Sequence, residues 1–123
     1  MDNKLKKVCT IEDISLNSSK SFNIEGHDIL ITNCDNKFFA TGLKCTHLNL
    51  SLEGGIVEDS RITCPHHKSV FNLKDGDVLQ GPQTVPGLNI KSPKVMTDIA
   101  QRFMKKLGVY KIEKKGNDIY VEI

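Results

Sequence analysis

The sequence predicts an all-β fold of antiparallel strands with one α-helix inserted near the C-terminus. Three observations predict this fold. Short segments of strand-like composition, several of them alternating apolar and polar residues, recur along the chain. Neighbouring segments are joined by a few turn-forming residues, which is typical of hairpins. Residues 92–108 instead carry apolar side chains at helical spacing.

The length and composition are those of one globular domain. The chain has 123 residues, enough to bury about two-thirds of its unfolded surface, so we expect a single domain over residues 1–123. Its net charge of +2 is too small to indicate a nucleic-acid partner. No apolar run reaches the length of a membrane span, and the N-terminus has no signal-peptide pattern. We therefore expect a cytoplasmic protein with no membrane partner, although an anchor outside this sequence stays open.

The first part of the chain is predicted to form hairpins. Its strand segments are Lys7–Ile11, Ser21–Glu25, Asp28–Cys34 and Lys37–Leu43. The last two are joined by Asp35 and Asn36, residue types that tolerate positive φ. Gly26 and His27 are predicted to turn the chain, with His27 a solvated turn residue because no cysteine or second histidine lies at ligand spacing from it.

Further hairpins follow in the middle and at the end of the chain. The middle segments are Ile56–Glu58, Arg61–Thr63, Val70–Leu73 and Asp77–Leu79, and the closing hairpin is Tyr110–Lys114 with Ile119–Ile123. Gly54 and Gly55 free the backbone before the first of these strands. The hairpin after them is expected to bring the chain back beside its earlier course.

The helical segment is amphipathic. Ser92 and Pro93 suit its start, and Gly108 suits its end. Its apolar stripe is expected to pack on the sheet rather than to bind a partner or a membrane, because an exposed stripe of that size favours aggregation. The stripe comprises Val95, Met96, Ile99, Ala100, Phe103, Met104 and Leu107, and the basic residues expected on the solvent face are Lys94, Arg102, Lys105 and Lys106.

One motif carries the chemistry of the chain. It reads Cys45-Thr46-His47, then sixteen residues, then Cys64-Pro65-His66-His67. Two thiolates and two imidazoles, contributed by two short loops, form a four-ligand metal site by spacing alone. The spacer contains the hairpin that returns the chain, so the two loops are expected to lie side by side.

The mixed loops favour an iron–sulfur cluster over zinc. Structural zinc sites usually pair like ligands a few residues apart. A loop with one cysteine and one histidine suits a [2Fe-2S] cluster in which two cysteines hold one iron and two histidines hold the other. A zinc-binding structural module with the same ligands remains an alternative.

At these residues the chain resembles the Rieske ferredoxin family. The family pattern of Cys-x-His, a spacer of this length and Cys-x-x-His is met in full, and Pro65 stands where the family carries proline. The resemblance implies one [2Fe-2S] cluster per chain, with Cys45 and Cys64 on one iron and His47 and His67 on the other. His66 is adjacent, but the family's two-residue gap selects His67.

The resemblance also implies a fold. It spans about residues 7–88 and the final hairpin, and it implies an antiparallel β-sandwich with a small cluster-binding subdomain at about residues 44–82. Gly81 and Pro82 begin the segment that covers the cluster in the family. The helical insert at about residues 92–108 has no counterpart in compact members.

Residues near the ligands bear on the reduction potential. High-potential relatives carry two further cysteines, where this chain has Leu50 and His66, and a tyrosine where it has Phe71, while their serine is kept as Ser69. The resemblance therefore implies a potential in the lower half of a range of about −150 to +300 mV, falling at alkaline pH. Lys68 replaces a glycine common in the family. Its charge would raise the potential slightly or mark a docking face, and the alternative is a merely solvated loop lysine.

The function implied is that of a soluble one-electron carrier between a reductase and an oxygenase or other oxidoreductase. No catalytic residues are expected: the chain has no nucleotide-binding glycine loop, and with His27 the only histidine outside the motif a second iron site has no ligands. An alternative is the small subunit of a larger oxidoreductase, as in nitrite reductase.

The two remaining cysteines, Cys9 and Cys34, are expected to be reduced, half-buried thiols on strands. A disulfide between them is the alternative, but the sequence carries no secretion signal.

Overall fold

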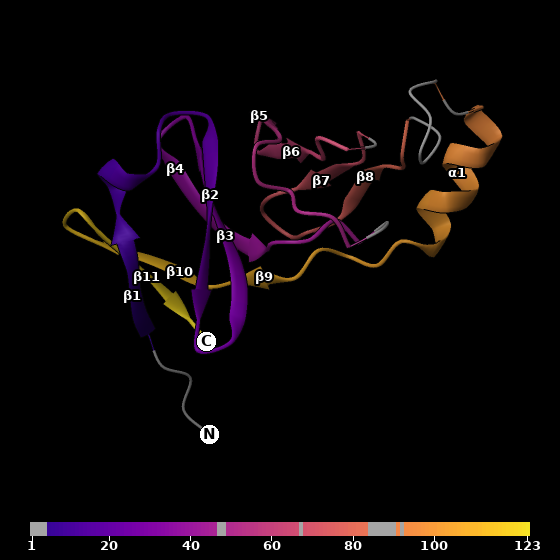
Figure 1. Ribbon diagram of the computed structural model, residues 1–123. Coiled ribbons are helices and arrows are strands. Elements are labelled where there is room, and N and C mark those ends of the chain that lie inside the picture. Colours follow the sequence, from indigo (N-terminus) through magenta and orange to yellow (C-terminus); the bar gives the residue numbers. More distant parts are fainter. Residues whose placement is uncertain (1–4, 47–48, 67, 84–90, 92) are drawn as a thin grey trace.

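The computed structural model describes residues 5–46, 49–66, 68–83, 91 and 93–123. In this part of the chain it confirms the predicted all-β class, with three antiparallel sheets and one α-helix (Figure 1). The elements are β1 (Leu5–Thr10), the 3₁₀ turn η1 (Ile11–Asp13), β2 (Ser18–Ile24), β3 (His27–Cys34), β4 (Lys37–Gly42), β5 (Ile56–Glu58), β6 (Arg61–Thr63), β7 (Val70–Asn72), β8 (Val78–Gln80), α1 (Lys94–Phe103), β9 (Val109–Tyr110), β10 (Ile112–Lys115) and β11 (Asp118–Glu122).

Two sheets pack face to face as a sandwich. One has the order β1-β11-β10 and the other the order β2-β3-β4-β9. Alternation along β11 explains the packing, because Ile119 and Val121 are fully buried while the residues that alternate with them, Tyr120 and Glu122, are only partly buried. The buried residues of the sandwich core are Cys9, Ile14, Ile29, Ile31, Ala40, Ile119 and Val121.

Strand β3 connects this sandwich to the third sheet. From Ile29 to Cys34 every residue is buried, because one face of the strand points into the sandwich core and the other into a second core. That second core lies against the sheet β5-β6-β7-β8, which Figure 1 shows between the sandwich and α1. Its buried members are Leu30, Cys34, Cys45, Leu52, Val57, Ile62, Cys64, Phe71, Leu73 and Leu107.

The predicted strand Tyr110–Lys114 is divided between two sheets. Val109 and Tyr110 pair with β4, whereas Ile112–Lys115 pair with β11. His27 is exposed as predicted, but it is the first residue of β3 rather than a turn residue, and its ring lies edge-on to Tyr110 with centroids 6.4 Å apart.

The predicted packing of the helix stripe on the sheet is wrong. Helix α1 begins close to the predicted start but ends at Phe103, before the predicted stop. The side chains of its apolar stripe are exposed: Val95 by 63%, Met96 by 55%, Ile99 by 48% and Phe103 by 84%. The buried residue of the helix is Thr97. No helix in the described part of the chain is long and apolar enough to cross a membrane.

Polar groups of the protein body beneath α1 explain this orientation. Backbone carbonyl groups of Val78 and Pro82 need donors there, and Thr97 Oγ1 donates to Pro82 at 2.7 Å and Gln101 Nε2 to Val78 at 3.3 Å. Gly81 permits the close approach, since a Cβ there would lie 2.5 Å from the carbonyl oxygen of Thr97. The polar face of the helix therefore faces the protein.

The end of the predicted stripe enters the core by another route. Beyond the helix the chain is extended, and Met104 and Leu107 pack against the second core from there. The backbone N–H of Leu107 donates to the carbonyl oxygen of Gly76 at 2.8 Å. Leu107 is buried, whereas the helical part of the stripe is left outside.

Candidate metal centre

The two cysteines of the motif begin turns with the same hydrogen-bond pattern. The N–H of Cys45 donates to the carbonyl oxygen of Leu50 at 2.7 Å, and the N–H of Asn49 donates back to Cys45 at 2.8 Å. In the second turn the N–H of Cys64 donates to Ser69 at 2.7 Å, and that of Lys68 donates back to Cys64 at 3.1 Å. Each cysteine is thus held at its backbone N–H and its carbonyl oxygen.

Each turn also has a left-handed residue four positions after its cysteine. The φ angles are +57° at Asn49 and +63° at Lys68. Glycine adopts this conformation without strain, asparagine tolerates it, and lysine is disfavoured there. The turn geometry therefore accounts for glycine being common in the family at the position of Lys68.

Strand pairing closes the base of each turn. Thr63 pairs with Val70 across β6 and β7, so the second turn is the tip of that hairpin. The first turn follows β4 and is closed by a bridge between Lys44 and Ser51. The strands thereby fix both turns at their ends.

The second core brings the two cysteines together. Cys45 and Cys64 are both buried in this core, although they are distant in sequence. The hairpin of β5 and β6 returns the chain, as the spacer predicted. His66 is exposed, while His47 and His67 lie outside the described residues.

Two buried hydroxyl groups accompany the cysteines. Ser69 is fully buried, and its Oγ has no hydrogen-bond partner in the part of the chain that the structure describes. The same holds for Oγ1 of Thr46, a residue that the sequence reasoning missed although it lies between Cys45 and His47 in the motif. Buried hydroxyls normally have a partner, so both are available to donate to a polar group that the described residues do not supply.

The other two residues expected near the centre are also buried. Phe71 lies on β7, fully buried in the same core as the cysteines. Pro82 is buried as well, and its carbonyl oxygen accepts the hydrogen bond from Thr97. The loop that follows β8 is therefore attached to α1.

An apolar hollow of about 240 Å³ adjoins the second turn. It lies beside the side chain of Cys64, with exposed Ile56 on its wall. Its lining comprises Gly54, Gly55, Ile56, Thr63, Cys64, Pro65 and Lys68. A protein that approaches the centre from this side meets an apolar recess with one cation at its edge.

Cys9 and Cys34 are reduced and lie in different cores. Burial, with a smaller contribution from the Asp13 carboxylate, raises the pKa of the Cys9 thiol to about 11. The Sγ of Cys34 accepts a hydrogen bond from the N–H of Ser60 at 3.3 Å. The prediction of reduced, strand-borne thiols is confirmed, but both are fully buried rather than half-buried.

The sheets and the two matching cysteine turns define a small antiparallel β-protein. The chain belongs to the Rieske [2Fe-2S] domain family, whose family model matches residues 4–106. The match includes α1, so the family likeness extends further than the motif and the strands around it implied.

Relatives include ferredoxin components of oxygenase systems. Ferredoxin CarAc of Metapseudomonas resinovorans is 28% identical over 94% of this chain and 90% of its own length. The 3-phenylpropionate/cinnamic acid dioxygenase ferredoxin subunit of Photorhabdus laumondii is 34% identical over 64% of this chain and 75% of its own length. Apoptosis-inducing factor 3 of Mus musculus is 28% identical over 67% of this chain, which spans only 13% of that protein.

Solved structures share the fold. The ferredoxin in a complex of reduced oxygenase and oxidized ferredoxin of carbazole 1,9a-dioxygenase superposes with a TM-score of 0.70, at 26% identity over 96% of this chain and 92% of that chain. A protein described as a nitrite reductase small subunit has the same TM-score of 0.70, at 17% identity over 96% and 97%. The second likeness shows the fold alone.

Proposed function

We propose that this chain is a one-electron carrier that passes electrons between a reductase and an oxygenase or other oxidoreductase. It would hold one Rieske [2Fe-2S] cluster, with Cys45 and Cys64 on one iron and His47 and His67 on the other. The observation that carries the proposal is the pair of matching turns, each beginning with a buried cysteine in the same core. We also propose that it works in the cytoplasm as a single domain.

The residues around the turns fit such a cluster. Inorganic sulfide and thiolate sulfur accept hydrogen bonds, and Ser69 and Thr46 offer buried hydroxyls that lack protein partners in the described part of the chain. The donor set of two thiolates and two imidazoles is that of a Rieske centre. The apolar side chains of Leu52, Ile62 and Phe71 line the same core and exclude water.

The cluster supplies a centre that gains or loses one electron. Cys45 and Cys64 would contribute one negative charge each, whereas neutral histidines contribute none, which favours the reduced state relative to four cysteines. The second ring nitrogen of each histidine would keep its proton, and that proton is lost more readily when the iron is oxidised. The Ser69 hydroxyl would stabilise the added charge, and Phe71 offers no such donor.

The proposed partners follow from the relatives. Those named as dioxygenase ferredoxin subunits are similar in length to this chain. The long relatives instead join a region of this kind to a much larger protein. Because the ferredoxin components are matched over most of their own length, we propose that the reductase and oxygenase of this carrier are separate proteins.

The test is anaerobic purification followed by analysis of the bound metal. We expect a red-brown protein with about two irons and two acid-labile sulfides per chain that takes up about one electron in a redox titration. A colourless protein with zinc or without metal would overturn the proposal. A chain that purifies only with a large oxidoreductase subunit would favour the nitrite reductase type of subunit instead.

A further inference from the structure

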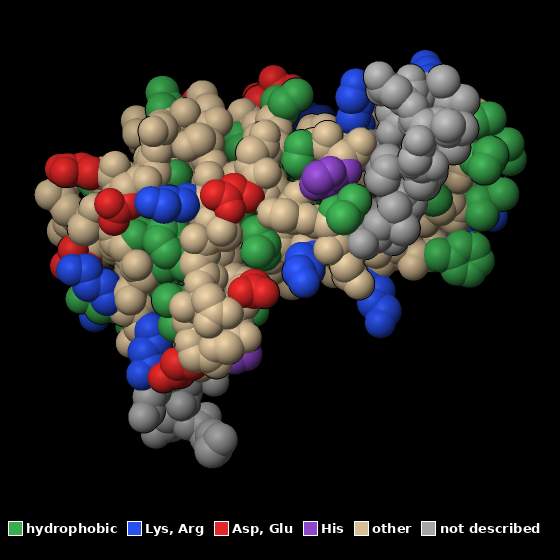
Figure 2. Space-filling view, viewed as in Figure 1, with side chains coloured by type: hydrophobic (Ala, Val, Ile, Leu, Met, Phe, Trp, Pro, Cys, Tyr) green, Lys and Arg blue, Asp and Glu red, His purple; other side chains and the backbone are tan. Residues whose placement is uncertain are grey.

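Helix α1 presents an apolar face to solvent. Val95, Met96, Ile99 and Phe103 follow one side of the helix, and about half or more of each side chain is exposed. Figure 2 shows hydrophobic side chains gathered at the end of the molecule occupied by the helix. Contiguous apolar surface of this kind marks interaction sites in folded proteins.

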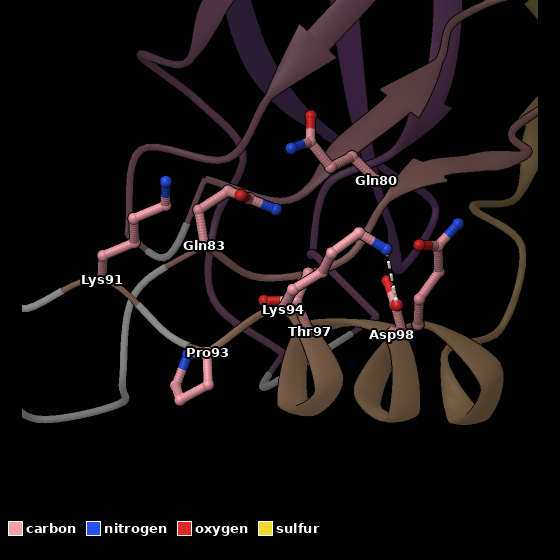
Figure 3. A pocket seen from close by; sticks show the side chains of 8 residues that line it. Gln80, Gln83, Lys91, Pro93, Lys94, Thr97 and Asp98 are labelled. Atoms are coloured by element: carbon pink, nitrogen blue, oxygen red, sulfur yellow. Dashed lines mark hydrogen bonds and ion pairs between the residues drawn. The ribbon is translucent and has the colours of Figure 1, made fainter.

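Contacts on the opposite side keep this face outward. Figure 3 shows Thr97 and Asp98 on the side of α1 that borders a polar hollow of about 490 Å³. The hydrogen bonds from Thr97 to Pro82 and from Gln101 to Val78 attach this side to the body. Rolling the helix to bury its apolar face would break both bonds and cover the carbonyl groups of Val78 and Pro82 with apolar side chains.

The apolar face lies within a basic region. Five exposed cations lie on or next to α1, and the carboxylates of Asp98 and Asp77 lie among them. Asp98 pairs with Lys94 at 3.0 Å, and Asp77 pairs with Lys106 at 3.2 Å, which leaves an excess of positive charge. The cations are Lys91, Lys94, Arg102, Lys105 and Lys106. A complementary surface is apolar at its centre and carries carboxylates around it.

A second copy of this chain does not fit that description. Packing two α1 helices together would bring their basic residues close to one another. Four side chains also fall well short of the roughly 800 Å² that each partner buries in a standard stable interface. The apolar face is therefore one part of a larger contact surface.

The rest of that surface leads to the metal centre. Gln80 and Gln83 line the hollow beneath α1, and they also line a neighbouring hollow that reaches Lys68 in the second cysteine turn. Pro82, which lies between Gln80 and Gln83 in the sequence, is buried, and its carbonyl oxygen accepts the hydrogen bond from Thr97. The two hollows thus lead from the second cysteine turn to α1, and a partner that covers both would extend onto the helix.

We propose that the apolar face of α1 docks the redox partner, a protein whose matching surface is an apolar groove bordered by carboxylates. The inference rests on the proposed function, because the partner is defined as the protein that exchanges an electron with this chain. It adds the place and the chemistry of recognition.

The test compares Ile99→Glu with Leu16→Glu. Leu16 is also an exposed apolar residue, 58% exposed, but it lies in the loop before β2. The probes are the purified reductase and terminal oxygenase of the source organism, and the rate constant of electron exchange with each is measured by stopped flow. With one of them Ile99→Glu should react at least about tenfold more slowly, because its carboxylate would be desolvated in the contact. Leu16→Glu should react at the wild-type rate.

Charge is tested by Arg102→Gln combined with Lys105→Gln. This variant should react more slowly at low salt, and its rate should depend less on ionic strength than that of the wild type. Unchanged cluster absorption, reduction potential and circular dichroism are required of every variant. They separate a docking defect from a damaged centre.

The outcomes are distinct. A wild-type chain that exchanges no electron overturns the proposed function and this proposal with it. Equal rates for Ile99→Glu and Leu16→Glu overturn this proposal alone. It is also overturned if the wild type dimerises through the helix in sedimentation analysis, or if the helix binds phosphatidylglycerol vesicles, and Ile99→Glu abolishes that association.

Discussion

The two cysteine turns share a backbone design and differ in their side chains. Both hold the cysteine through a pair of backbone hydrogen bonds, and both place a left-handed residue four positions later. At equivalent positions the first turn has Asn49 and Leu50, whereas the second has Lys68 and Ser69. The backbone thus treats the two cysteines alike, while the cation belongs to the second turn and the buried hydroxyls stand at different positions, that of Thr46 one residue after Cys45 and that of Ser69 five residues after Cys64. The backbone geometry that positions the two cysteines is therefore shared, whereas the side chains that would adjust the reduction potential of a bound centre differ between the turns.

The largest expected effect comes from removing either thiolate. Cys45→Ser and Cys64→Ser should each abolish the visible absorption of the cluster, because a serine hydroxyl is a much weaker ligand for iron than a thiolate. Iron analysis and absorption spectra of the anaerobically purified variants check this. A variant that kept a normal cluster would show that the substituted cysteine is not a ligand of the cluster.

The second turn offers a matched pair of histidines. His67→Gln should lose or convert the cluster, whereas His66→Gln should retain it, since His66 is exposed and the motif assigns His67 as the ligand. The same iron and absorption measurements apply. The reverse result would show that the ligand is His66.

A smaller effect is expected from the buried hydroxyl of the second turn. Ser69→Ala should lower the reduction potential by about 50 mV or more, because a hydrogen bond to sulfur stabilises the more negative, reduced state by roughly 1 to 2 kcal/mol. Phe71→Tyr should raise it if the new hydroxyl reaches sulfur. Both shifts are measured by redox titration.

Ser19→Ala is the matched control for Ser69→Ala. Ser19 Oγ is also buried without a partner among the described residues, but it lies on β2 in the sandwich. Its removal should leave the potential unchanged. Equal shifts in the two variants would mean that Ser69 does not act through the centre.

The sequence predicted these turns well because their information is local. Spacing in the motif placed Cys45 and Cys64 in separate loops, and the two-residue turn at Asp59 and Ser60 returned the chain between them. Positive φ at both turn residues matches that structure. The left-handed conformation of Asn49, by contrast, has no signal in the sequence alone, since asparagine occurs in many turn positions.

The orientation of α1 could not be predicted in the same way. Helical spacing shows that Val95, Ile99 and Phe103 share a face, but it does not show what that face meets. The surface beneath α1 is formed by backbone carbonyl groups and by Gln80 and Gln83, so it favours contact with the polar side chains of the helix. The surface against which a helix packs is known only from the assembled fold. Here that surface is polar, so the helix has the opposite orientation to the one expected.

The smallest expected effect separates strain from charge in the second turn. Lys68→Gly should raise the free energy of unfolding by about 1 kcal/mol, because glycine adopts a φ of +63° without the penalty that lysine incurs. Asn49→Gly should gain less, since asparagine already tolerates that region. Thermal melting of the anaerobic, cluster-loaded variants checks the difference, which corresponds to a few degrees in Tm.

Lys68→Ala completes the comparison, because it removes the charge and keeps the left-handed strain. It should therefore give no gain in Tm. If the lysine charge raises the reduction potential, Lys68→Ala and Lys68→Gly should lower the potential equally, whereas an unchanged potential in both would make Lys68 a solvated residue of the turn. A gain in Tm for Lys68→Ala as large as that for Lys68→Gly would assign the destabilisation to charge and remove the backbone explanation.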